Sequence, residues 1–282
     1  MTIIGAGVVG TATGYALAEI GHKVSFVDVN VNRIAALQSE GFAATTEPMP
    51  GLSGVVLLSV PTPSMGTGYD FSMIEAAIRT LGSAISTHTD EVIIVVRSTV
   101  TPGFSDRFLR PWIEAASHRK VGENLSLISA PEFLRQASAA TDARTPWMTV
   151  VGGHDPRAVE RIELLFAPLG GETATFDNPT SAELVKIVHN CFNAAKISFW
   201  NEMTLLCDHL GVKQLEIGEV VAKSAEGSFN PLYGITGGRP FAGACLPKDL
   251  DGLIGFAEEE LLEVPLLRAV RAVNAVYEQG DA

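Results

Sequence analysis

The chain has 282 residues, 46% of them hydrophobic and 18% charged, so it can build folded cores and is too apolar for wholesale disorder. This length allows one large or two medium domains, because single cores stop growing at roughly 250–300 residues. A formal net charge of −12 and a pI near 4.9, with no Lys/Arg-rich run, exclude non-specific attraction to nucleic acid or to an anionic membrane.

The N-terminal segment alternates between apolar and glycine-rich stretches. A short apolar run leads into Gly5-Ala-Gly7-Val-Val-Gly10, a helical pattern follows to Ile20, and a second apolar run ends at Asp28. The pattern predicts a strand, a glycine-rich turn, a helix and a strand that closes on an acidic residue. No secretory signal precedes it and no charge-free run reaches the ~18 residues of a membrane span, so we expect a cytoplasmic protein.

Strand-like and helical stretches then alternate, which is typical of a parallel sheet covered by helices on both faces. The strand-like runs are residues 54–60, 91–96, 125–129 and 148–151, and the helical ones are residues 73–85, 104–116 and 157–166. We therefore expect a Rossmann-like, doubly wound parallel sheet of the α/β class.

The pattern becomes purely helical after residue 177. Residues 181–210 read as one long helix, residues 215–223 as a short one, and residues 249–278 as helical again. The sequence predicts an α/β domain over residues 1–177 and an all-helical domain over residues 178–282. The apolar length of the long helix predicts an oligomer, because an isolated helix of this kind exposes too much apolar surface.

The glycine turn predicts a dinucleotide site. Gly5 allows the tight turn, Gly7 allows close approach of a pyrophosphate and Gly10 allows the helix to pack on the strand, with Val8 and Val9 at the helix start. Asp28 is suited to accept ribose hydroxyls and to repel a 2′-phosphate, which favours NAD over NADP. Arg33 leaves an alternative open, since it can either cradle a phosphate or be a solvated surface residue.

Two further loops follow strand-like runs and are expected at the carboxyl edge of the sheet, where ligands bind. They contain Pro61 and Thr62 in one case, and Thr99 in the other. Their prolines and glycines have a plainer interpretation as strand terminators.

Two groups of residues carry potential chemistry in the helical part. Glu183, Lys186, Asn190 and Asn193 are spaced three, four and three residues apart, so they form one helix face that is either a site or solvated. Cys245 lies among small residues before Lys248, which can favour the thiolate, and Asp249, which can orient a proton carrier or cap a helix. A lone cysteine is otherwise more often buried and inert. The three cysteines, Cys191, Cys207 and Cys245, have neither disulfide nor metal-ligand spacing, so free thiols and no metal are expected.

These motifs together resemble the UDP-glucose/GDP-mannose dehydrogenase family, which oxidises the primary alcohol of a sugar to a carboxylate with two NAD. The resemblance spans nearly the whole chain; its segments are the glycine turn with Asp28, Val60-Pro-Thr-Pro63, Ser98-Thr-Val100, Ala130-Pro-Glu-Phe-Leu-Arg135, Glu183-Leu-Val-Lys186 with Asn190, Asn201-Glu202, and Cys245-Leu-Pro-Lys-Asp249.

The resemblance implies a role for each matching residue. Cys245 would be the nucleophile, Lys186 and Asn190 would stabilise charge on the substrate oxygen, Asp249 with Thr99 would hold a water, and Glu132 would act as acid/base or water activator. Further cofactor contacts are expected from Pro61, Thr62, Thr99 and Lys248. The implied chemistry is a hydride transfer to give an aldehyde, a thiohemiacetal on Cys245, a second hydride transfer to a thioester, and hydrolysis.

The sequence also departs from the family pattern. The C-terminal domain that usually holds the nucleotide of the substrate is not in this chain, and Pro240, Ala242 and Ala244 stand where glycine, glycine and serine are usual. The arginine usually presented by a second subunit has no counterpart in residues 224–233, and Arg239 is an unaligned alternative to it. These differences suggest, as a hypothesis, a nucleoside-like substrate or a sugar other than an ordinary UDP-hexose.

Two other functions fit parts of the pattern. A two-electron dehydrogenase like the β-hydroxyacid dehydrogenases also combines a Rossmann domain with a catalytic lysine and asparagine, but does not need Cys245. A non-catalytic NAD-binding scaffold would need none of Lys186, Asn190 and Cys245.

Overall fold

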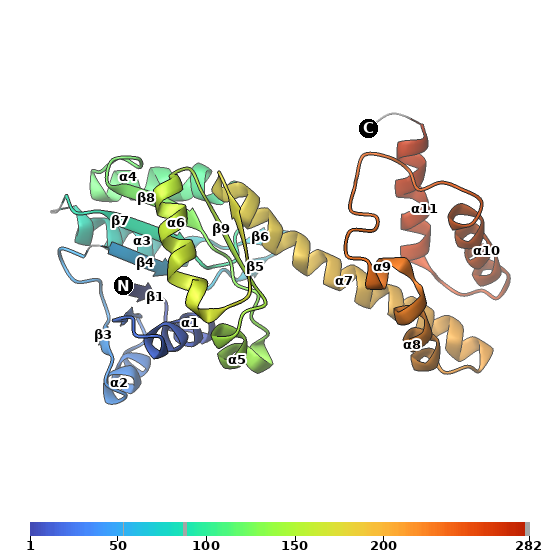
Figure 1. The fold of residues 1–282 in the computed structure, drawn as a ribbon, viewed down its shortest axis with the longest axis horizontal. Helices are drawn as coiled ribbons and strands as arrows, with labels where there is room; N and C mark the ends of the chain where they lie inside the picture. Colours follow the sequence, from blue (N-terminus) through green and yellow to red (C-terminus); the bar gives the residue numbers. More distant parts are fainter. Residues whose placement is uncertain (53, 87–88, 280–282) are drawn as a thin grey trace. The chain divides into compact units, whose positions relative to one another are not determined.

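The computed structural model describes residues 1–52, 54–86 and 89–279. The chain forms two compact units, Met1–His189 and Asn190–Ala282, which are described separately (Figure 1). The division falls within a long helix, because residues of its first turns, such as Ala182 and Glu183, are buried in the first unit. The domain boundary expected near residue 177 stays a prediction.

The first unit is built on an eight-stranded sheet in the order β10-β9-β8-β7-β4-β1-β2-β3. The strands are β1 (Thr2–Ile4), β2 (Ser25–Val27), β3 (Ala43–Thr45), β4 (Gly54–Leu58), β7 (Val92–Val96), β8 (Leu125–Ser129), β9 (Met148–Gly153) and β10 (Glu172–Phe176), with a separate hairpin of β5 (Ser64–Met65) and β6 (Gly68–Tyr69). The helices are α1 (Val8–Glu19), α2 (Val31–Ser39), α3 (Ser72–Ile85), a π-helical turn (Ser105–Leu109) that leads into α4 (Arg110–Ser117), α5 (Ala139–Arg144) and α6 (Pro156–Phe166), with 3-10 turns at Gln136–Ser138 and Ala167–Leu169.

Both faces of the sheet are buried, which explains why its central strands are continuous apolar runs. In β7, Ile93 and Val95 belong to the hydrophobic cluster on the face of α1, α2 and α6, whereas Val92, Ile94 and Val96 belong to the cluster beneath α3 and α4. This arrangement confirms the predicted doubly wound α/β fold.

One junction of the sheet is antiparallel. Strand β9 pairs antiparallel with β8, while the other neighbouring pairs, including β9 with β10, are parallel. The segment between β8 and β9 contains the short helix α5 and a 3-10 turn, and it lacks the long helix that usually connects parallel strands.

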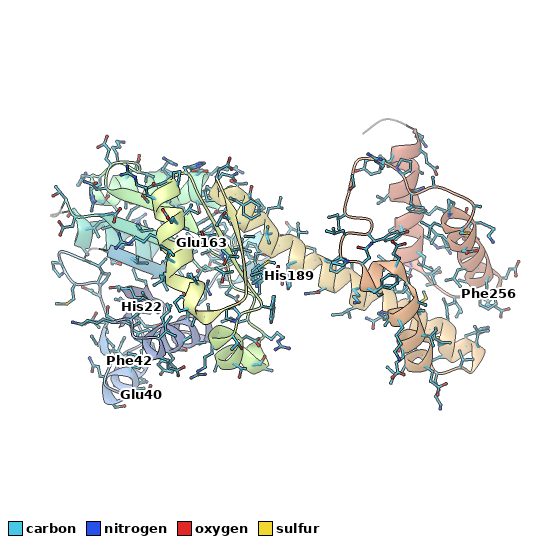
Figure 2. The ribbon with its side chains drawn as sticks, viewed as in Figure 1. His22, Glu40, Phe42, Glu163, His189 and Phe256 are labelled. Atoms are coloured by element: carbon cyan, nitrogen blue, oxygen red, sulfur yellow. The ribbon has the colours of Figure 1, made fainter. Side chains whose placement is uncertain are left out.

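The second unit is helical throughout its described residues. Helix α7 (Pro179–Leu210) begins in the first unit, and α8 (Gln214–Ser224), α9 (Glu226–Phe229), α10 (Leu246–Glu259) and α11 (Pro265–Glu278) follow it. Its core is a small cluster of Leu206, Ile254, Ala257, Val264 and Leu267, and Phe256 of α10, labelled in Figure 2, packs against it. The long helix predicted for residues 181–210 is confirmed.

The single helical stretch predicted for residues 249–278 is wrong in one respect. The structure divides it into α10 and α11, with Leu261 at φ +58° and Pro265 at the start of α11. Proline disfavours helical geometry in the residue before it, so the chain leaves α10 and begins a new helix. No helix in the described ranges has the length and apolar character needed to cross a membrane.

Candidate active site

The three glycines of the first turn have different structural reasons. Gly5 has φ +95°, and a Cβ on this residue would lie 2.5 Å from the carbonyl oxygen of Ser59. A Cβ on Gly10 would lie 1.9 Å from the carbonyl oxygen of Gly5. A Cβ on Gly7 would meet no atom within 4 Å, and its φ of −76° suits any residue. The fold therefore requires glycine at positions 5 and 10, while the open space above Gly7 is of use to a ligand that approaches the backbone.

The start of α1 is suited to bind phosphate. Gly7 caps the helix without a side-chain hydrogen bond, and the first helical bond of this turn runs from the Thr11 amide to the Gly7 carbonyl. The amides of Val8, Val9 and Gly10 thus belong to the first turn, where N–H groups lack helical acceptors and carry the positive end of the helix dipole. These residues fit the pyrophosphate of a dinucleotide.

Asp28 is fixed beside this turn. Its carboxylate is 8% exposed and accepts hydrogen bonds from the amides of Ala6, at 2.7 Å, and Asn30, at 2.8 Å. Arg33 lies 3.5 Å from the same carboxylate, with its side chain half exposed. A carboxylate has further lone pairs to accept hydrogen bonds from ribose hydroxyls, so this acceptor fits NAD. Arg33 is an ion-pair partner of Asp28 with a half-exposed side chain, and both roles that the sequence left open for it stay predictions.

The two loops at the carboxyl edge are joined to each other. The hydroxyl of Thr62 donates to the carbonyl of Thr99 at 2.7 Å, and that of Ser98 donates to the carbonyl of Val60 at 2.6 Å. Pro61 lies between Val60 and Thr62, the two residues of the first loop that form these hydrogen bonds. The loops therefore form one connected edge beside the glycine turn, and do more than end their strands.

Lys186 and Glu132 come together from α7 and the loop after β8. The Lys186 ammonium lies 3.4 Å from the Glu132 carboxylate, and the two side chains are 8% and 11% exposed. The other carboxylate oxygen of Glu132 accepts the amide of Leu134, and the ammonium lies 5.4 Å from the ring centre of Phe133. This is a nearly buried ion pair at the carboxyl edge of the sheet.

Glu183 anchors the start of α7. Its carboxylate is 2% exposed and accepts the amides of Gly103, Phe104 and Ser105 together with the Ser105 hydroxyl, at 2.6–3.1 Å. Burial raises the pKa of Glu183, although these hydrogen bonds oppose the shift. Glu183 and Lys186 are therefore not part of a solvated stripe, and the anchoring role of Glu183 was not predicted.

Arg97 is a second residue that the sequence analysis missed. Its guanidinium is buried, donates to the carbonyl of Ala130 at 3.0 Å, and lies 4.9 Å from the ring centre of Phe166. Burial lowers the pKa of Arg97 to about 10, and the charge of Glu132 acts in the opposite direction. The signal was available, because an arginine directly follows an apolar strand.

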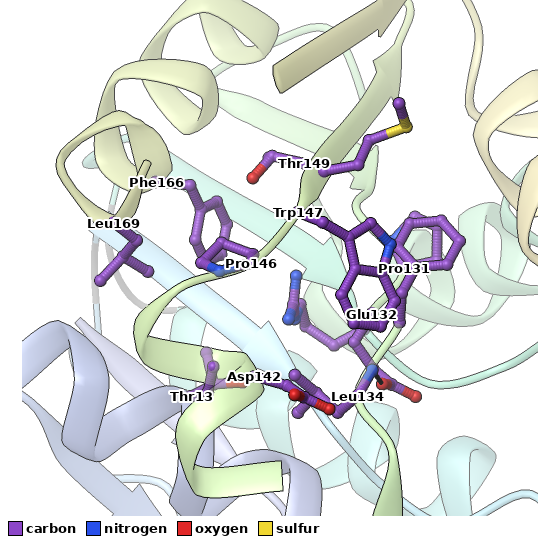
Figure 3. A pocket seen from close by; sticks show the side chains of 14 residues that line it. Thr13, Pro131, Glu132, Leu134, Asp142, Pro146, Trp147, Thr149, Phe166 and Leu169 are labelled. Atoms are coloured by element: carbon purple, nitrogen blue, oxygen red, sulfur yellow. Dashed lines mark hydrogen bonds between the residues drawn. The ribbon is translucent and has the colours of Figure 1, made fainter. Parts of the chain in front are cut away.

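Arg97 and Glu132 are both among the residues that line a small cavity, which Figure 3 shows from close by. The cavity measures about 30 Å³, and the buried Nε of Arg97 and hydroxyl of Thr13, which have no protein partner, both belong to residues that line it. A volume of this size has room for about two ordered waters, which would satisfy both groups. The cavity belongs to the surroundings of Glu132.

Cys245, Lys248 and Asp249 lie on one turn of the second unit. Cys245 is exposed and caps α10; the Asp249 amide donates to its carbonyl at 2.9 Å. The Lys248 ammonium lies 3.1 Å from the Asp249 carboxylate, with both side chains exposed. The three thiols are free as predicted, with Cys191 exposed and Cys207 buried. Asn190 is exposed on α7, four residues beyond Lys186.

The sheet, the turn open at Gly7 and the fixed Asp28 define a dinucleotide-binding protein of the Rossmann class. Residues 1–51 and 39–170 match the family model for the NAD binding domain of the UDP-glucose/GDP-mannose dehydrogenase family, and residues 180–276 match the model for its central domain. The chain belongs to the UDP-glucose/GDP-mannose dehydrogenase family, and it is an NAD-dependent dehydrogenase. The resemblance drawn from the sequence is thereby confirmed.

Individual relatives cover almost all of the chain. UDP-glucose 6-dehydrogenase of Haloferax volcanii is 32% identical over 97% of this chain and 69% of its own length, and GDP-mannose 6-dehydrogenase of Azotobacter vinelandii is 30% identical over 99% and 69%. The crystal structure of a ternary complex of GDP-mannose dehydrogenase from Pseudomonas aeruginosa matches with a TM-score of 0.89 at 29% identity, covering 99% of this chain and 69% of that one.

Proposed function

We propose that this protein oxidises the primary alcohol of a nucleotide sugar or nucleoside-like substrate to a carboxylate in two steps, with Cys245 as the covalent nucleophile. The observation that carries the proposal is the exposed Cys245 thiol at the N-terminus of the 14-residue helix α10. A helix N-terminus favours negative charge, and the small residues before Cys245 leave its sulfur accessible to a substrate carbon. The names of the relatives, which are 6-dehydrogenases of UDP-glucose and GDP-mannose, support a nucleotide-sugar alcohol.

The turn at Gly7 and the carboxylate of Asp28 would hold NAD, which would supply the hydride acceptor for each oxidation. The alcohol first loses a hydride and a proton to become an aldehyde. The Cys245 sulfur then forms a bond to the aldehyde carbon and the oxygen takes up a proton, which gives a thiohemiacetal. Loss of a second hydride and of that proton gives a thioester, and water cleaves the carbon–sulfur bond to release the carboxylate and the thiol.

Lys186 and Glu132 are suited to the charges that develop in this sequence. We assign Lys186, with the Asn190 amide, to the substrate oxygen, where an ammonium stabilises negative charge more strongly when it is shielded from water. Glu132, 3.4 Å from Lys186, is assigned to proton transfer or to the activation of water. Asp249 and Thr99 are assigned to hold the hydrolytic water, and Lys248 to contact the cofactor.

We further propose a homodimer. The second unit exposes large apolar side chains on α7 and α8, including Phe192, Ile197, Leu215 and Val220, which are 63–69% exposed. Such groups on neighbouring helices mark an interaction surface. Light scattering after gel filtration tests this proposal, and a monomeric mass at micromolar concentration would contradict it.

The experiment that tests the mechanism is the capture of the covalent intermediate. Enzyme, NAD and one candidate from UDP-glucose, GDP-mannose and nucleoside alcohols are mixed at a single turnover and quenched in acid. Intact-mass and peptide analysis should find the acyl group on Cys245 for the true substrate. A protein that turns over a substrate with no adduct on Cys245, under conditions where a thioester is chemically stable, would instead be a two-electron dehydrogenase.

A two-electron dehydrogenase is the second candidate. It is favoured by the Lys186–Glu132 pair, because this pair supports alcohol oxidation without a thiol. In that case, Cys245→Ser would leave the rate and the product unchanged. A non-catalytic scaffold would oxidise none of the substrates.

A further inference from the structure

Among the described residues, one buried side chain forms hydrogen bonds to the loop that leads to Cys245. Asn274 of α11 is 7% exposed, and its amide oxygen accepts the amide of Phe241 at 2.7 Å. Its amide nitrogen donates to the carbonyl of Phe241 at 3.1 Å and to Glu278 at 2.9 Å. One side chain therefore pairs with both polar groups of one backbone residue, as a neighbouring strand would do.

The rest of this loop has few constraints of its own. Residues 230–245 contain no helix or strand, Gly238 and Gly243 have φ of +80° and +94°, and a Cβ on either glycine would meet no atom within 4 Å. Across residues 234–244, which are all described, Phe241 is the position whose backbone is hydrogen-bonded to another element. The contact with Asn274 is therefore the fixed point of the loop.

Cys245 lies between this fixed point and α10. On its C-terminal side, Ile254 and Ala257 of α10 pack in the core of the second unit, but Cys245 and Leu246 at the start of the helix are exposed. Burial therefore does not hold the thiol in place. Its position depends on the helix at one end and on Phe241, four residues earlier, at the other.

We propose that Asn274 is a positioning residue for the nucleophile: by holding the backbone of Phe241, it keeps the loop before Cys245, and thereby the thiol, in the place needed for attack on the aldehyde carbon. The proposal rests on the function proposed above, because it assumes that Cys245 forms the covalent adduct. Asn274 touches neither substrate nor cofactor in this account. Its effect is confined to the second oxidation, since the first hydride transfer does not involve Cys245.

Because only the second oxidation should be affected, an experiment can distinguish a positioning role of Asn274 from a general structural role. Asn274→Leu removes the hydrogen bonds at similar side-chain volume, and Asn274→Asp keeps an acceptor for the Phe241 amide but loses the donor to its carbonyl. Misplacement by about 1 Å can slow a reaction ~100-fold, so the second oxidation should slow by ~10–100-fold in Asn274→Leu and less in Asn274→Asp. The NADH formed per substrate should fall from two towards one, with aldehyde released and trapped by semicarbazide.

Glu202→Leu is the matched control. Glu202 is also 7% exposed, and its carboxylate accepts the amides of Leu266 and Leu267 at the start of the same helix, α11. This variant removes buried hydrogen bonds from α11 without touching the loop. It should be destabilised like Asn274→Leu but should still form two NADH per substrate.

The test uses the full chain with NAD and the substrate that the capture experiment identifies among UDP-glucose, GDP-mannose and nucleoside alcohols. NADH per substrate is measured for wild type, Asn274→Leu, Asn274→Asp, Glu202→Leu and Cys245→Ala, and hydrogen exchange of residues 234–245 shows whether the loop is released. The expected result is faster exchange and a fall of NADH per substrate towards one in Asn274→Leu, a smaller change of both in Asn274→Asp, and neither change in Glu202→Leu. If Cys245→Ala gives one NADH and Asn274→Leu gives two, the positioning role is overturned and the covalent mechanism stands. If Cys245→Ala still gives two, the proposed function itself fails. Should Asn274→Leu not fold, Asn274→Asp decides by the same readout.

Discussion

Lys186 and Cys245 are held in opposite ways. Lys186 is buried, pairs with Glu132 and follows one turn after Glu183, whose four hydrogen bonds fix the start of α7. Cys245 is exposed and follows a glycine-rich loop that is anchored at Phe241. A group that stabilises charge works best when it is fixed and shielded from water, whereas a nucleophile that forms and releases an acyl group needs access. The difference teaches that one reaction can demand rigidity at one residue and exposure at another.

The largest expected effect is at Lys186. Lys186→Ala removes the proposed stabilising charge and leaves the Glu132 carboxylate nearly buried without its cation, so kcat should fall ~10²–10³-fold. Lys196→Ala, on the exposed part of the same helix, is the matched control and should stay within twofold of wild type. Equal rates for the two variants would remove Lys186 from the mechanism.

The glycine turn offers a similar comparison. The fold requires glycine at position 10, whereas at position 7 we expect the bound cofactor to require it. Gly10→Ala places a Cβ 1.9 Å from a backbone oxygen and should prevent stable folding, whereas Gly7→Ala has open space and should change the free energy of unfolding by less than ~0.5 kcal/mol. NAD binding by Gly7→Ala should nevertheless weaken by about tenfold or more, as measured by calorimetry. Wild-type affinity in a folded Gly7→Ala would contradict the assignment of this space to the cofactor.

The third prediction concerns how the contribution of Glu183 to the free energy of unfolding depends on pH. Because burial raises its pKa above the ordinary 4.5, the folded state binds the proton more tightly than the unfolded state does. The contribution of Glu183 to the free energy of unfolding should therefore decrease as pH rises from about 4.5 through its folded pKa, and remain constant above it. Urea unfolding of wild type and Glu183→Gln between pH 4 and 8 measures this difference. A contribution that increases over the same interval would mean that the hydrogen bonds outweigh burial.

The smallest effect is expected at Arg33. Its ion pair with Asp28 is long, at 3.5 Å, and its side chain is half exposed, and such pairs contribute about 0–1 kcal/mol. Arg33→Ala should therefore change NAD affinity by less than about fivefold and should not create NADP activity. Arg33→Gln serves as the control for lost side-chain packing. A much larger loss of NAD affinity would show that Arg33 contacts the cofactor directly.

The predictable parts of the molecule are those with local signals. The sheet follows from short apolar runs, the cofactor turn from three glycines and an aspartate, and the long helix from its periodicity. The break between α10 and α11 also had a local signal in Pro265, which the broad helical pattern of the segment masked.

The parts that could not be predicted depend on distant partners. Glu183 bonds to residues as many as 80 positions away, and Asn274 to a residue 33 positions away. Nothing in the residues beside them distinguishes an anchor from a solvated side chain. The antiparallel β9 likewise depends on how the chain after β8 returns to the sheet. Sequence motifs can locate the candidate catalytic residues. The residues that fix them in position are recognised only from the folded structure.

The central claim is that Cys245 carries the second oxidation. The direct measurement is the NADH formed per substrate consumed, for wild type, Cys245→Ala and, as a matched exposed thiol, Cys191→Ala. The account predicts two NADH for wild type and Cys191→Ala, and one NADH with released aldehyde for Cys245→Ala. Two NADH from Cys245→Ala, or one NADH from all three proteins, would contradict it.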